Sequence, residues 1–136
     1  MPISDVVFLD GNDPEEMMFS DDPYSYGKWF SAKNIDTIPL SVLGELLGVA
    51  SYKELMKGFQ PILPPEGESF LLSFPEPLQD RIRVLSDQEI VDVASKWSKI
   101  DEFRGGVVEE SLQNYIKGLR SFLNSVNGYA SLFLSV

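Results

Sequence analysis

Apolar residues recur every three or four positions in the last third of the chain, which is the spacing of one face of an α-helix. The clearest run consists of Val108, Leu112, Tyr115, Leu119, Phe122 and Val126. It predicts a long helix, and Gly128 is the expected C-cap, because glycine is frequent just past helix ends. The apolar segment 129–136 follows and predicts a terminal strand.

The N-terminal segment 3–9 predicts a second strand. Residues 6–9 form a continuous apolar run, and the Asp-Gly-Asn-Asp-Pro sequence that follows is a strong turn signal. A continuous run indicates burial on both faces of a sheet, so we expect this strand to be central. The C-terminal strand is its expected neighbour, because it is the other segment with a clear strand pattern.

Shorter helices are predicted between these strands, over residues 38–48, 51–59, 78–85 and 86–100. In the first, the expected buried stripe is Leu40, Leu43, Leu46 and Leu47. Ser86 and Glu89 have the spacing of a capping box at the start of the last one, which carries Trp97 on its apolar stripe. Segment 69–74 fits either a strand or an extended loop, and a short helical turn over 13–18 would have Asp13 as its N-cap.

Together these patterns predict an α+β fold that is mainly helical. Five or six helices are expected to pack on a small sheet that includes the N- and C-terminal strands. The length of 136 residues fits a single globular domain over residues 1–136.

The chain contains neither cysteine nor histidine. This excludes disulfides, zinc–thiolate sites, Ser-His-Asp triads and histidine-ligated cofactors. An enzyme would have to act through carboxylates, lysine, tyrosine or backbone groups. We therefore favour a protein that is not an enzyme and expect no cofactor.

Negative charge is concentrated near the N-terminus. Residues 1–36 hold eight acidic and two basic residues, whereas the whole chain has a net charge of −10. Such a surface repels nucleic acid and anionic membrane and attracts a basic protein, so we expect no nucleic acid and no membrane. No secretion signal or membrane-spanning run is expected, which predicts a cytoplasmic protein.

Residues 10–30 combine these acids with aromatic side chains, as many protein-binding surfaces do. The candidate partner-binding residues are Asp10, Asp13, Glu15, Glu16, Asp21, Asp22, Tyr24, Tyr26 and Trp29. No metal site is expected, because Pro14 and Glu15 stand where a calcium loop needs an oxygen ligand and a glycine. Three alternatives remain: the acids maintain solubility, they pair with Arg81 and Arg83, or Trp29 and Phe30 merely cover the core edge.

These observations predict a non-catalytic, acidic protein-binding domain. An inhibitor or immunity-type protein that neutralises a basic partner, for instance a nuclease toxin, is the concrete form of this hypothesis. One alternative is a carboxylate-based enzyme or small-ligand binder with a pocket between helices and sheet. Another is a structural subunit that forms a homodimer, so the sequence leaves monomer and homodimer both open.

Overall fold

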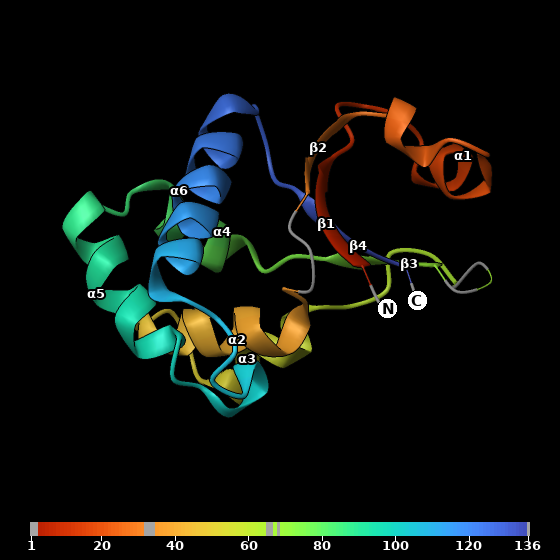
Figure 1. Ribbon diagram of the computed structural model, residues 1–136. Coiled ribbons are helices and arrows are strands. Elements are labelled where there is room, and N and C mark those ends of the chain that lie inside the picture. The colour runs from red at the N-terminus through yellow and green to blue at the C-terminus, as the bar shows by residue number, and fades with distance from the viewer. Residues whose placement is uncertain (1–2, 32–34, 65–66, 68, 136) are drawn as a thin grey trace.

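The computed structural model describes residues 3–31, 35–64, 67 and 69–135 (Figure 1). The strands are β1 (Ile3–Phe8), β2 (Lys28–Ser31), β3 (Ser69–Ser73) and β4 (Ser131–Ser135). The helices are α1 (Pro14–Phe19), α2 (Thr37–Leu46), α3 (Tyr52–Gly58), α4 (Glu76–Arg83), α5 (Asp87–Trp97) and α6 (Glu109–Ser125), with single 3-10 turns η1 (Pro23–Ser25) and η2 (Asp101–Phe103). This confirms the predicted α+β fold, in which helices predominate and both terminal strands belong to the sheet.

The four strands form one antiparallel sheet in the order β2-β1-β4-β3. Strand β1 is central, as its continuous apolar run predicts, and it pairs with β4 in a register that places Val6 opposite Leu132. The segment left open between strand and loop is strand β3, which pairs with the other side of β4. The two terminal segments therefore form the middle of the sheet.

The two faces of the sheet are covered by different parts of the chain. In Figure 1, α2 to α6 lie on one side of the sheet and α1 lies on the other. Val6 and Leu132 are fully buried in the main core on the side of the larger helical layer. Val7 and Phe133 face the opposite way, because side chains alternate along a strand, and they join Met17 and Met18 of α1 in a second, smaller cluster.

Helix α6 is rotated about its axis relative to the predicted apolar stripe. Its fully or nearly fully buried residues are Leu112, Ile116, Leu119 and Leu123. Val108 is not a core residue: it precedes the helix as its N-cap and is 66% exposed. Tyr115 and Phe122 are partly buried, because their long aromatic side chains reach the core from the flanks of the stripe.

Two further details of the prediction are wrong. Leu46, the last residue of α2, is 38% exposed, whereas Leu47 of the same predicted stripe packs against the main core. Gly128 is not the C-cap of α6; Val126 holds that position in an extended conformation. The predicted caps at Asp13 and Ser86 are confirmed, as is the capping box of Ser86 with Glu89. Trp97 is fully buried, as expected, and its indole Nε1 donates a hydrogen bond to the Pro39 carbonyl at 2.9 Å.

Candidate functional site

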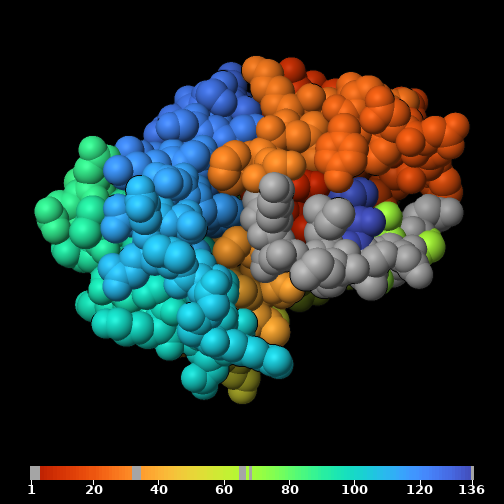
Figure 2. Space-filling view, in the orientation of Figure 1, coloured from red at the N-terminus to blue at the C-terminus, as the bar shows by residue number. Residues whose placement is uncertain are grey.

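The candidate surface is built on residues 10–26, the segment that connects β1 to its antiparallel neighbour β2. Figure 2 shows the atoms of this segment, in orange, gathered at one end of the molecule. The segment begins with a helix-start signal: Asp13 accepts a hydrogen bond from the Glu15 backbone N–H at 2.9 Å, and Pro14 occupies the first helical position. Met17 and Met18 bury their side chains, so the other faces of this short helix point away from the sheet.

All six acidic residues of the predicted site lie on this segment and are exposed: Asp10, Asp13, Glu15, Glu16, Asp21 and Asp22. Within the described residues, none of them takes part in an ion pair. The alternative in which Arg81 and Arg83 pair with this segment is therefore wrong. Arg81 contacts Glu89 at 2.5 Å, and Arg83 contacts Asp80 at 3.5 Å.

Tyr24 connects the exposed segment to a buried carboxylate. The residue is 48% exposed, and its ring centroid lies 4.5 Å from that of Trp29, while its hydroxyl donates to Asp5 Oδ2 at 2.8 Å. Asp5 is only 1% exposed and also accepts a hydrogen bond from the Ser31 hydroxyl at 3.2 Å. Burial, followed by the hydrogen bond to Asp5 and the negative charge of that carboxylate, raises the pKa of Tyr24 to about 12.

Trp29 and Phe30 lie on opposite faces of β2. The Trp29 ring packs edge-on against Phe133 at 5.4 Å, and its indole N–H donates to the Tyr26 carbonyl at 2.6 Å. Phe30 packs on α6, against Tyr115 at 5.6 Å. Tyr26 and Trp29 are half-buried and belong to the smaller cluster, so both also help to hold the segment on the sheet.

Phe19 is a further candidate residue that was not among those predicted from the sequence. It is the last residue of α1 and is 64% exposed. The signal was present: successive helical residues are turned by about 100°, so a residue that follows two inward methionines points elsewhere. Phe19 adds a large apolar side chain to a segment otherwise rich in carboxylates.

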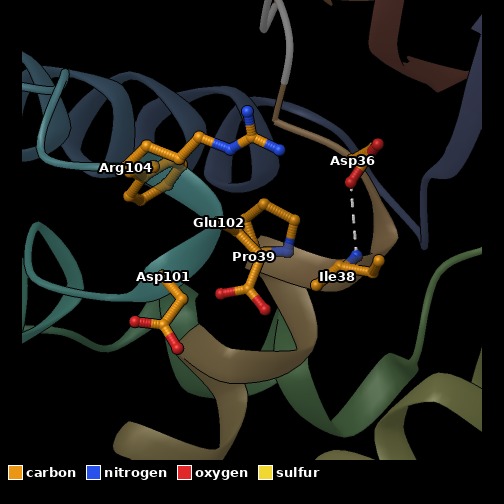
Figure 3. A pocket seen from close by; sticks show the side chains of 7 residues that line it. Asp36, Ile38, Pro39, Asp101, Glu102 and Arg104 are labelled. Carbon is orange, nitrogen blue, oxygen red and sulfur yellow. Dashed lines mark hydrogen bonds between the residues drawn. The ribbon is translucent and has the colours of Figure 1, made fainter.

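A second group of acids lines a shallow hollow of about 450 Å³ elsewhere on the molecule (Figure 3). Its lining residues are Asp36, Ile38, Pro39, Asp101, Glu102, Phe103 and Arg104. Arg104 has a left-handed backbone with φ of 50°, and Figure 3 shows its guanidinium on the other side of Pro39 from the carboxylates of Asp101 and Glu102. No sheet residue lines this hollow, so it is not the pocket between helices and sheet that the sequence left open.

Within the described ranges, no cluster of three or more acidic side chains is arranged to hold a metal ion. None of the helices in those ranges has both the length and the apolar character needed to cross a membrane. Comparisons of the chain with protein-family models, with curated proteins and with solved structures return no match. Function is therefore inferred from the surface itself.

Proposed function

We propose that the chain is a non-catalytic protein-binding domain that holds a basic partner protein on residues 10–26. An inhibitor or immunity-type protein that neutralises a basic toxin, such as a nuclease, is the concrete form of this function. The observation that carries the proposal is the exposure of Phe19 and Tyr24 on the same segment as six carboxylates without a described ion pair. Exposed aromatic side chains beside unpaired charges are typical of interfaces.

The two kinds of side chain would act at different stages of binding. The carboxylates attract a basic surface over distances of about 10 Å at moderate salt, which accelerates association. Phe19 and the face of Tyr24 would then be buried on contact, which slows dissociation. Tyr24 is suited to an anchoring role because its hydroxyl is already held by Asp5, so its ring is fixed before a partner arrives.

The test is capture of a partner from the source lysate, followed by binding kinetics on the captured protein. Asp13→Asn, Glu15→Gln and Glu16→Gln, combined in one variant, should slow association severalfold at low salt, because they remove three charges from the surface. The fold should persist, since asparagine is as good an N-cap as aspartate. High salt should abolish the difference between this variant and the parent protein.

A matched control removes the same charge from another place. Asp101→Asn, Glu102→Gln and Glu110→Gln, combined, change exposed acids outside residues 10–26 and should leave association nearly unchanged. Association that is insensitive to salt would contradict the proposal. A loss of association confined to the control variant would also contradict it, because it would place the partner at the hollow that Asp101 and Glu102 line together with Arg104.

A further inference from the structure

The sheet has two edge strands, and their outer sides differ. Along β3, the backbone of the preceding segment closes the edge: the Ile62 N–H donates to the Leu71 carbonyl at 2.9 Å, and the Ser73 N–H donates to the Gln60 carbonyl at 2.8 Å. Along β2, the described residues provide no backbone hydrogen bond on the side away from β1. An edge of this kind presents unpaired N–H and C=O groups to another strand.

The hydrogen bonds at β3 fix which groups face each way. Successive residues of an antiparallel strand direct their N–H and C=O groups to opposite sides. The Leu71 carbonyl and the Ser73 N–H are bonded on the outer side. The backbone groups of Leu72, between them, therefore point to β4, where the paired residue is Leu132. The backbone N–H and C=O of Leu132 therefore point to β3, and those of the next residue, Phe133, point to β1.

The register carries this alternation across β1 to β2. Asp5 of β1 pairs with Phe133, so the backbone groups of Asp5 point to β4. Those of the following residue, Val6, therefore point to β2. Val6 pairs with Phe30, so the backbone groups of Phe30 face β1. Trp29 and Ser31, on either side of it, therefore direct their N–H and C=O groups to the open edge.

From this geometry we propose that β2 receives an extended, basic segment of the partner protein as an added strand, hydrogen-bonded to Trp29 and Ser31. Strand addition to an exposed sheet edge is a recurrent mode of peptide recognition, in which main-chain hydrogen bonds contribute to affinity. The inference rests on the proposed function and deepens it by naming the part of the partner that is bound.

Charge decides between a basic segment and a second copy of the chain. The acidic segment leads directly into β2, and Tyr24 contacts Trp29 at 4.5 Å between ring centroids. A basic strand on this edge would bring positive charge to a chain whose net charge is −10, and in β2 it would meet a single basic residue, Lys28. A second copy would instead bring an identical acidic segment to the same edge, in a chain whose net charge is −10.

The test uses a synthetic probe in place of an unidentified partner. The probe is a short peptide of alternating lysine and valine, which favours an extended conformation. Its control has the same sequence and charge but carries backbone N-methyl groups on alternate residues, which prevent strand pairing. In amide NMR spectra of the protein, the unmodified peptide should shift the Trp29 and Ser31 signals, and the methylated peptide should bind roughly tenfold more weakly.

A pair of variants tests the same edge from the protein side. Ser31→Pro removes an outward N–H, and proline is tolerated where the N–H of an edge strand faces solvent. Ser31→Ala also removes the hydroxyl that bonds Asp5 but keeps the N–H, so it controls for that loss. The proline variant should bind the unmodified peptide roughly tenfold more weakly than the alanine variant.

The outcomes separate this inference from the proposed function. Equal, salt-dependent binding of both peptides would overturn strand addition and leave the acidic surface in place. If neither peptide shows salt-dependent binding, the result would count against both strand addition and the proposed function. Shifts at Trp29 and Ser31 that grow with protein concentration without any peptide would show pairing with a second copy, which also overturns the inference.

Discussion

Tyr24 shows how a single residue can belong to both the fold and the candidate surface. Its ring is half-exposed, yet its hydroxyl is bonded to the buried carboxylate of Asp5, 19 residues away in the sequence. A buried carboxylate that loses a donor is costly, which ties the position of the exposed ring to the sheet beneath it. The acidic surface is therefore attached to β1 by polar as well as apolar contacts.

The raised pKa of Tyr24 gives a pH-dependent prediction. Its value of about 12 in the folded protein lies above the ordinary 10.0, so the fold favours the neutral phenol. This contribution to stability is fully present below pH 10 and is lost as the pH rises towards 12. In an absorbance titration of phenolate, the difference between the parent protein and Tyr24→Phe should titrate near pH 12.

Asp5→Asn provides the control for this titration. It removes the negative charge beside Tyr24 and should lower the pKa only partway, because burial is the largest cause of the shift. A Tyr24 phenol that titrates at its ordinary pKa in the parent protein would show that in solution it is neither buried nor bonded to Asp5.

At the scale of single residues, the sequence predicts features that depend on neighbouring residues in the chain. The N-cap at Asp13 was predicted because it depends on the next two residues, Pro14 and Glu15. The contact of Tyr24 with Asp5 was not, because it requires the register of β1 with β2, which residue type alone does not specify. The exposed position of Phe19 follows from local spacing, because Phe19 comes directly after two inward methionines.

Among the elements, α6 best illustrates how a pattern can give the right helix and an imperfect face. The predicted stripe contains Leu112 and Leu119, which are buried, but omits Ile116, which is fully buried. Apolar side chains occur around more than one side of this helix, so periodicity leaves its rotation uncertain by about one residue. The neighbouring elements decide that rotation.

The close packing of Phe30 against Gly118 helps to fix the rotation of α6 about its axis. A Cβ atom at this position would lie 2.9 Å from the Phe30 ring, closer than real Cβ atoms come to their neighbours. The glycine lets the aromatic ring of β2 lie against the helix between Tyr115 and Phe122, at centroid distances of 5.6 and 5.9 Å. Glycine weakens a helix interior, so its presence here is explained by close packing.

The rotation of α6 can be checked by comparing two truncations. Ile116→Ala should cost about 2–5 kcal/mol in the free energy of unfolding, because it opens a cavity in the main core. Val108→Ala should cost less than about 0.5 kcal/mol, because that side chain is 66% exposed. Denaturant titration measures both values, and the reverse order would restore the face that sequence spacing predicts.

At the scale of the whole molecule, the sheet separates two hydrophobic clusters of unequal size. The larger one unites the sheet with α2 to α6, and the smaller one consists of Val7, Met17, Met18, Leu71 and Phe133 with partly buried neighbours. The continuous apolar run of β1 predicted burial on both faces of the sheet, but it did not identify which helices cover which face. That assignment depends on long-range packing, such as that of Met17 and Met18 in one cluster with Phe133, which the sequence does not reveal.

Adjacent residues of β4 allow the two clusters to be perturbed one at a time. Leu132 is fully buried in the larger cluster, and Phe133 is buried in the smaller one, where it contacts Trp29 and Tyr24. Leu132→Ala should lower the free energy of unfolding by about 2–5 kcal/mol and accelerate amide exchange throughout the main core. Phe133→Ala should cost a comparable 3–5 kcal/mol or so, but its earliest effect should be faster exchange in residues 14–26.

The difference between these variants matters for binding. If the smaller cluster holds the acidic surface in place, Phe133→Ala should weaken binding of a basic partner, because the partner must then order the segment as it binds. This loss should be seen even at temperatures where α6 remains protected from exchange. Leu132→Ala should leave affinity unchanged at temperatures where the protein is fully folded. Amide exchange followed residue by residue measures this separation, and identical exchange profiles in the two variants would show that the sheet and both clusters open together.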